Sequence, residues 1–383
     1  MIPCRSIRNA LVAGFVLAAS FGVLRCAAAP QVVVPDNLPA QIGDDAFWRM
    51  VSDFSEPGGY FRSDNFLSNE NAFQIVIPEL SRNERIGGVY LGVGPEQNFT
   101  YLVALQPKLA FIIDIRRQNM LEHLLYKALI ERSATRVEFL SRLFARKPPS
   151  DLGANPSVEA LFEAYEHAPA AGELFQENLQ VVKDQLIERH GFDLSSDDLR
   201  SIEYVYRAFY DGGPDLNYSF LSGGRGGWGW FPTYAQLMTE TDGQGVQRSY
   251  LATEENFRIL RKLESNNAIV PVVGDFAGPK AIRSVGGYLR DHRATVTAFY
   301  TSNVEQYLFQ QDDDWKKFFS NVATLPIDGS STFIRSVSNR GFQYRGSGAG
   351  WRAMPRLCSI ADLLKAFDGG RMSRYSDVIA MSK

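Results

Sequence analysis

The sequence predicts an α/β fold, in which a mostly parallel sheet carries helices on both faces and a large helical insertion follows the second strand. Three observations predict it. Short runs of β-branched and aromatic residues alternate with stretches of helical period, which is typical of βαβ units. Each run ends in glycine or polar residues. Between the second and third runs, residues 133–253 are largely helical in pattern.

The first two strands flank the most informative motif. Gly88–Leu91 reads as a strand, and Gly92-Val93-Gly94 follows it. Pro95 is expected to open a helix that runs to about Gln106, because proline is favoured at a first helical position. The apolar run Leu109–Ile113 then predicts a strand buried on both faces.

An acidic residue completes this motif. Asp114 follows the second strand and lies 22 residues after Gly92. Glycines let a backbone approach a ligand closely, a helix N-terminus supplies unpaired N–H groups, and such a carboxylate accepts ribose hydroxyls. The order therefore predicts a Rossmann-like nucleoside-binding crevice; the alternative is a set of tight turns that binds nothing.

Later strands should bring more polar groups to the same place. Ile269–Val273 is followed by Gly274-Asp275-Phe276, and Thr295–Tyr300 is followed by Thr301-Ser302-Asn303. A further strand is expected at 331–337 and a closing helix near 360–367. Ligands of open parallel sheets bind at the carboxyl ends of the strands. We therefore expect Asp114 and Asp275 to converge on the crevice beside Gly92 and Gly94.

The helical insertion contains two distinctive peptides. Ser195 has the position of an N-cap, with Asp198 three residues on, for a helix that Gly212 ends. The peptide Gly223–Trp230 is either a mobile loop that packs on a ligand ring or a glycine-rich connection whose tryptophans dock in the core.

The N-terminal leader has the order of a secretory signal peptide. Arg5 and Arg8 precede the apolar run Ala10–Leu24, and the small residues of 26–29 follow. The mature protein is then periplasmic or secreted and keeps no membrane span; the alternatives are an uncleaved anchor or a start at Met50. The precursor has a net charge of −3, and the leader holds three arginines and no acidic residue. This acidic domain gives no electrostatic reason to expect nucleic acid as a partner.

The predicted organisation has five parts: a signal peptide (1–29), a linker and N-terminal cap or lid (30–84), the first half of the α/β domain (85–132), the insertion (133–253) and the second half (254–383). Within the cap, residues 61–70 read either as a surface loop or as a ligand-covering lid. No metal site is expected, because the four histidines are dispersed and no H-E-x-x-H is present.

Residues 85–131 and 254–340 resemble the class I S-adenosylmethionine-dependent methyltransferase fold. The resemblance implies that Gly92 and Gly94 approach the methionine part of the cofactor and that Asp114 binds its ribose. Asp275 and Phe276 would hold the adenine, and Tyr300 and Asn303 would orient the acceptor as catalytic residues. The implied function is methyl transfer to a small or envelope-associated acceptor.

The peptides 55–65 and 302–308 also resemble an uncharacterised bacterial group of exported methyltransferase-like proteins. The chain departs from the wider family at Leu91, where an acidic residue is usual, and at 301–304, which lack an Asn/Asp-Pro-Pro-Tyr signature. Two other functions remain: a non-catalytic exported binding protein, and an NAD-dependent oxidoreductase. The last is disfavoured, because Asn98 stands where a third glycine would fall.

Overall fold

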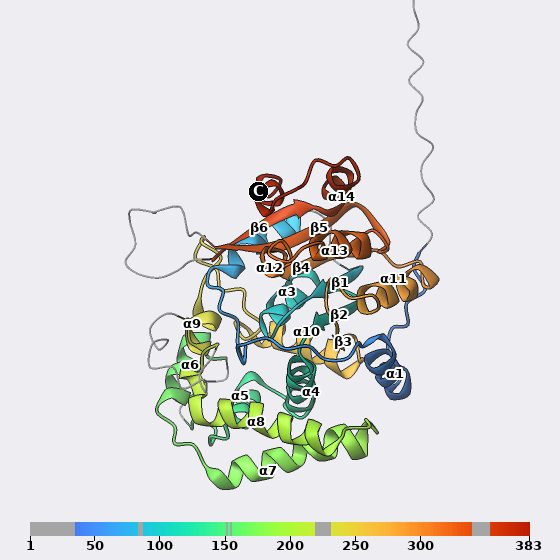
Figure 1. Cartoon of the computed structure of the whole chain (residues 1–383). Coiled ribbons are helices and arrows are strands. Elements are labelled where there is room, and N and C mark those ends of the chain that lie inside the picture. Colours follow the sequence, from blue (N-terminus) through green and yellow to red (C-terminus); the bar gives the residue numbers. More distant parts are fainter. Residues whose placement is uncertain (1–34, 83–86, 151, 154, 219–230, 339–352) are drawn as a thin grey trace, which may run out of the picture. The chain divides into compact units, whose positions relative to one another are not determined.

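The computed structural model describes residues 35–82, 87–150, 152–153, 155–218, 231–338 and 353–383 (Figure 1). The predicted signal peptide and the Gly223–Trp230 peptide lie outside the described residues. The chain divides into the units Met1–Pro35 and Asp36–Lys383, and the second holds every helix and strand described here.

The second unit is an α/β structure around a six-stranded, mostly parallel sheet. The strand order is β3-β2-β1-β4-β5-β6, with β1 to β5 parallel and β6 antiparallel to β5. The strands are β1 (Val89–Gly92), β2 (Leu109–Asp114), β3 (Ile269–Val273), β4 (Val296–Ser302), β5 (Ile327–Ser338) and β6 (Ala353–Ser359). The fold class is thus confirmed at this level. β6 was not predicted, because its sequence contains a proline and an arginine and lacks a clear alternation.

The positions of β2 and β3 in the sheet explain their sequences. Every residue of β2 is buried, as expected for a central parallel strand covered on both faces. β3 is the edge strand, and its Val273 directs its N–H and C=O outward, to the Ser55 hydroxyl and the Glu56 N–H. Backbone groups alternate in direction along a strand, so the nitrogen of Pro271, two residues before Val273, also points away from β2. Its missing N–H therefore removes no bond to β2.

Helices fill the connections between the strands. Before β1 lie α1 (Asp44–Phe54), the 3₁₀ turn η1 (Phe73–Val76) and α2 (Ile77–Arg82). Between β1 and β3 lie α3 (Gln97–Leu105), α4 (Arg117–Glu131), α5 (Arg136–Phe144), α6 (Val158–Glu166), α7 (Gly172–Lys183), the π-helix η2 (Asp184–Arg189), α8 (Ser196–Gly212), η3 (Gly213–Asp215), α9 (Tyr234–Thr239) and α10 (Glu254–Ser265). After β3 come α11 (Ala281–Asp291), α12 (Val304–Leu308), α13 (Asp314–Val322), α14 (Ile360–Asp368) and α15 (Tyr375–Ala380).

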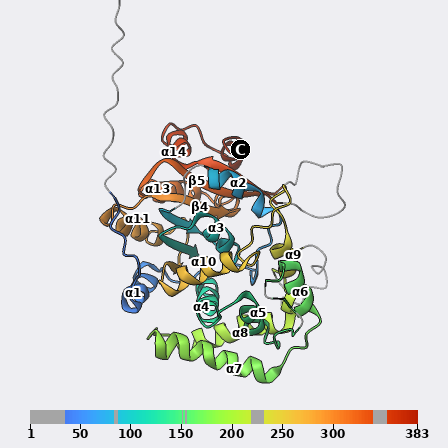
Figure 2. The same cartoon turned by 180° about the vertical axis from the view of Figure 1, so that it is seen from behind.

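The insertion between β2 and β3 is helical, as predicted. Figures 1 and 2 show α5 to α8 gathered on one side of the sheet, with α14 on the opposite side. α8 begins after Ser195, and Ser195 and Asp198 form the reciprocal bonds of a capping box. α4 packs against both α8 and β3, so it joins the insertion to the sheet.

Arg136 holds the two ends of the insertion together. Its side chain is fully buried at the start of α5. It donates to the carbonyl oxygens of Leu251 (2.7 Å) and Ala252 (3.0 Å) and to the Glu254 carboxylate (2.9 Å). The chain therefore leaves the sheet and returns to it at neighbouring points. Among the described residues, no helix is long and apolar enough to cross a membrane.

Candidate functional site

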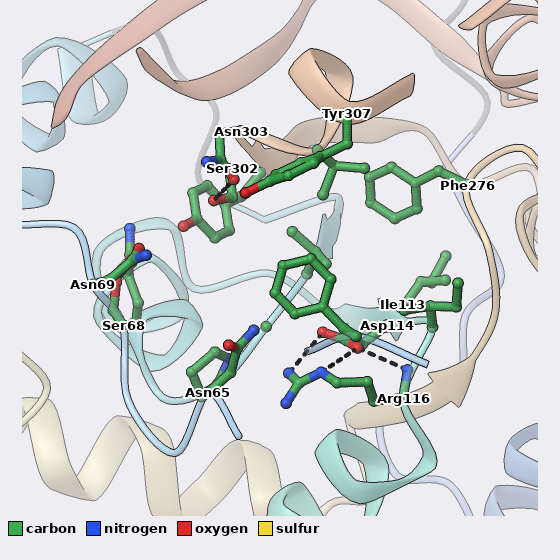
Figure 3. Close-up of a pocket in the computed structure, with 18 of the residues that line it drawn as sticks. Asn65, Ser68, Asn69, Ile113, Asp114, Arg116, Phe276, Ser302, Asn303 and Tyr307 are labelled. Carbon is green, nitrogen blue, oxygen red and sulfur yellow. Dashed lines mark hydrogen bonds and ion pairs between the residues drawn. The ribbon is translucent and has the colours of Figure 1, made fainter. Parts of the chain in front are cut away.

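A pocket of about 320 Å³ opens at the carboxyl ends of β1, β2, β3 and β4 (Figure 3). This volume is at the lower end of the range for small-molecule sites. Figure 3 places Ser302, Asn303 and Tyr307 on one side of the cavity and Asp114 and Arg116 on the opposite side. Six of the seven residues predicted from the sequence line this pocket: Gly94, Asp114, Asp275, Phe276, Tyr300 and Asn303.

The seventh, Gly92, lies at the end of β1 beneath the glycine turn and is not among the lining residues. A Cβ there would stand 2.0 Å from Oδ1 of Asn98, so glycine is needed for close packing. Gly94 has a φ of +79°, which a non-glycine residue rarely adopts. The helix α3 begins at Gln97, two residues later than the predicted Pro95.

Asn98 holds the glycine turn in place. Its Nδ2 donates to the carbonyl oxygens of Val93 (3.0 Å), Gly94 (3.1 Å) and Pro95 (2.8 Å). Its Oδ1 accepts the Tyr90 hydroxyl at 2.8 Å. The residue that replaces a third glycine is therefore the anchor of the turn.

Replacing Asn98 with alanine is expected to lower the free energy of unfolding by about 2–3 kcal/mol, because it leaves the buried Tyr90 hydroxyl and the turn carbonyls without their partner. Urea unfolding measures this. Asn178→Ala is the matched control: Asn178 is also buried, but its Nδ2 donates to the Arg142 carbonyl in the insertion. An Asn98→Ala protein that unfolds at the wild-type urea concentration would contradict the anchoring role.

Asp114 is already engaged by a neighbouring arginine. Its Oδ1 accepts the Arg116 backbone N–H (2.8 Å) and Nε (3.2 Å), and its Oδ2 accepts Nη2 (3.2 Å). Both side chains are 7% exposed. The guanidinium also donates to the Asp64 carbonyl oxygen. A carboxylate offers about four lone-pair positions, so one on Oδ2 stays open to a ligand.

The turn after β3 is held from the N-terminal segment. The Glu56 carboxylate accepts the N–H groups of Lys280 (2.8 Å) and Ala281 (2.8 Å), at the start of α11, and that of Asp275 (3.3 Å). An acidic group at a helix N-terminus is favourable. Phe276 stacks on Phe318 with ring centres 5.3 Å apart. Asp275 and Phe276 are thus fixed at the pocket by contacts outside it.

Residues 60–70 form a wall of the pocket. Seven of them line it: Tyr60, Phe61, Asn65, Leu67, Ser68, Asn69 and Glu70. The Ser68 N–H donates to the Glu96 carboxylate at 3.2 Å, and its hydroxyl donates to Gln97. The stretch 61–70 mixes both kinds of environment: Leu67, Ser68 and Glu70 are buried, whereas Arg62 is exposed.

A group of buried carboxyls lies beside the glycine turn, and none of them was predicted from the sequence. Burial raises the pKa of Glu70 and Glu122, and it raises the pKa of Glu96 to about 8. Neither carboxylate oxygen of Glu122 has a hydrogen-bond partner among the described residues. Burial also lowers the pKa of His123 to about 4, and its Nε2 contacts the Gly94 carbonyl oxygen at 2.9 Å. Acidic side chains are ordinarily solvent-exposed, so no sequence signal marked these three as buried.

Glu96 is expected to make stability fall with rising pH. Its folded-state pKa of about 8 exceeds the usual 4.5, so the folded state holds the proton more tightly. The free energy of unfolding then decreases between these values, by up to about 1.4 kcal/mol per pH unit. Glu96→Gln should flatten this slope in urea unfolding measured from pH 5 to 8.

Glu138→Gln is the control for this pH series. Hydrogen bonds from Ala134 and Arg142 hold the pKa of Glu138 below its usual value against its partial burial. Its contribution therefore changes below about pH 4.5 and leaves the slope above pH 5 as in the wild type. An unchanged slope in Glu96→Gln would show that Glu96 is ionised in the folded protein at pH 5.

In the part of the chain that the structure describes, no group of three or more histidine, cysteine, aspartate or glutamate side chains could hold a metal ion. The model of one protein family, described as "Domain of unknown function (DUF7790)", matches residues 65–151 and 148–356. These ranges include every pocket residue except Tyr60 and Phe61. No curated protein matches the chain.

Proposed function

We propose that this chain, which belongs to the DUF7790 family of domains of unknown function, is an exported protein that binds S-adenosylmethionine and transfers its methyl group to a small or envelope-associated acceptor. One observation carries the proposal: Gly94, Asp114 and Asp275, which lie at the carboxyl ends of three different strands, line one pocket. A Rossmann-like methyltransferase fold would use these strand ends for the methionine, ribose and adenine parts of the cofactor.

The charge of the pocket supports this ligand. Among the described residues that line it, the charged ones are Glu70, Asp114, Asp275 and Arg116, so acidic groups outnumber basic ones there. Because Arg116 is paired with Asp114, the remaining charge favours a cation, and S-adenosylmethionine carries a sulfonium. The open position on Oδ2 of Asp114 would accept a ribose hydroxyl, with Arg116 fixing the carboxylate. Phe276 would offer an apolar contact for adenine.

Methyl transfer is an in-line displacement that depends on alignment more than on strong acid or base groups. Tyr300 and Asn303, at the end of β4, would orient the acceptor against the methyl group. Tyr300 is only 3% exposed and lies beside Glu70, whereas Asn303 is partly exposed at the pocket. The two side chains therefore supply a buried hydroxyl and an accessible amide.

Binding of NAD is disfavoured by two features. Asn98 fills the place of the third glycine with side-chain bonds to the turn. A dinucleotide fold joins two mononucleotide-binding halves, whereas here the second half ends in an antiparallel β5–β6 pair. The strand order itself, β3-β2-β1-β4-β5-β6, agrees with either ligand class.

A non-catalytic exported binding protein is the second candidate. The ion pair between Arg116 and Asp114 favours it, because most of the acceptor capacity of Asp114 is already used. The predicted export also favours it, since S-adenosylmethionine is made in the cytosol.

Calorimetric titration of the folded protein with S-adenosylmethionine, S-adenosylhomocysteine and NAD separates these functions. We expect heat from the first two ligands and none from NAD. No heat from either adenosyl ligand, in a protein whose circular dichroism shows folding, would reject the proposal and favour the binding protein.

A further inference from the structure

Glu70 is a buried carboxylate at the wall of the pocket, and no cationic side chain of the described ranges is its partner. It is 4% exposed and lines the pocket beside Tyr300 and Ser302. The Ser302 hydroxyl donates to its Oε1, and Gln97 Nε2 donates to its Oε2 at 3.1 Å. None of the ion pairs among the described residues includes Glu70. Its partners are therefore neutral donors.

Such a carboxylate is suited to accept a proton. Burial without a counter-ion favours its protonated form and raises the pKa of Glu70, while side-chain hydrogen bonds from Ser302, Gln97, Tyr300 and Ser336 oppose this shift. A general base works best when its pKa lies near the operating pH. All four donors are neutral, and Glu70 lines the pocket, so an acceptor hydroxyl that enters there can take the place of one of them on the carboxylate.

The adjoining part of the pocket is aromatic. Phe61 and Tyr307 meet edge to face, with ring centres 5.8 Å apart, and Tyr60 is 85% exposed at the same rim. Arg116 is the one basic residue among the described residues that line the pocket, and it is paired with Asp114. An anionic acceptor would thus meet Glu70 and Asp275 without a free cation. A neutral molecule with an aromatic or apolar body fits this region better.

We propose that the methyl acceptor is a neutral hydroxyl compound with an aromatic or apolar body, and that Glu70 takes its proton. This inference rests on the proposed methyl transfer. The acceptor oxygen forms a bond to the methyl carbon as the carbon–sulfur bond breaks, and the electron pair of that bond stays on sulfur. The hydroxyl proton passes to a carboxylate oxygen of Glu70. The products are a methyl ether, neutral S-adenosylhomocysteine and protonated Glu70, which returns its proton to water.

The test uses four probes that share one ring and differ in the acceptor atom: p-cresol, p-toluidine, p-toluate and 4-methylbenzenethiol. The full chain is incubated with S-adenosylmethionine labelled in its methyl group, and label in each product is counted. We expect transfer to p-cresol above the other three. Glu70→Gln should lower this transfer by about 100-fold or more and remove the rise of rate with pH, while S-adenosylmethionine affinity, which the charge of Glu70 also supports, falls by no more than about tenfold.

Glu264→Gln is the matched control, because Glu264 is also a buried carboxyl with a raised pKa and lies outside the pocket. Its transfer rate should equal that of the wild type. Three results would overturn the inference: no transfer to p-cresol by protein that binds S-adenosylmethionine, equal transfer to p-toluate or p-toluidine, or full activity in Glu70→Gln. If the wild-type protein does not bind S-adenosylmethionine at all, the proposed function itself is rejected.

Discussion

S-Adenosylmethionine binding is expected to weaken by about one to two orders of magnitude when Asp114 is replaced by alanine. A ribose hydroxyl that donates to a carboxylate makes a charge-assisted bond worth about 1.5–3 kcal/mol, and each 1.4 kcal/mol is about tenfold in affinity. The open position on Oδ2 lies at the pocket. Calorimetric titration measures the loss.

Removing Asp114 also leaves Arg116 buried without its partner, which could weaken binding indirectly. Two further variants separate this effect from the loss of a ribose contact. Asp114→Asn keeps an oxygen for the Arg116 N–H bonds but removes the charge, and we expect a weakening of about tenfold. Asp198→Asn is the matched control. It breaks a second arginine–aspartate pair, in which Arg117 meets Asp198 at 2.6 and 2.9 Å, outside the pocket. Equal S-adenosylmethionine affinity of wild type and Asp114→Asn would show that the Asp114 carboxylate does not bind this ligand.

Glu305→Ala is expected to lower the free energy of unfolding by about 3–5 kcal/mol, because it strands a buried charge. Glu305 is the second residue of α12, which begins two residues after the end of β4, and Arg335 lies in β5. Their side chains are 1% and 0% exposed, and Arg335 donates to both carboxylate oxygens of Glu305. The pair therefore fixes the segment that carries Asn303.

Urea unfolding of two further variants shows whether the buried charge causes this loss of stability. The double variant Glu305→Leu/Arg335→Met removes both charges and should recover most of the stability, since an apolar pair of similar volume often replaces a buried ion pair without cost. Lys365→Ala removes a partner of an exposed pair, with side chains 73% and 65% exposed, and should change stability by less than about 1 kcal/mol. A Glu305→Ala protein as stable as Lys365→Ala would show that water reaches Arg335.

The sequence predicted those strands and caps whose signals lie within one short segment. The runs at 109–113 and 269–273 are apolar throughout and became β2 and β3. The Ser195 cap was predicted because its bonds join residues three apart. The polar ends of these strands met at one pocket, since parallel strands end at a common edge.

What the sequence did not predict depends on contacts between distant segments. Glu70 lies next to Ser302, which is 232 residues away, and Glu56 caps a helix that begins 225 residues later. The periodicity of a short segment gives no information on contacts between residues so far apart in the sequence. The burial of Glu96 and Glu122 follows from the packing of residues 60–70 and α4 over the glycine turn, so their shifted pKa values were equally out of reach.

The bonds from Arg136 to Leu251 and Ala252 bear on how this protein can evolve. A segment whose ends meet adds little closure entropy when its length changes, because that entropy grows only with the logarithm of length. Residues can be gained or lost between α5 and α9 without pulling β2 away from β3. A longer or shorter helical module is therefore compatible with the same spacing of the strand ends at Asp114 and Asp275.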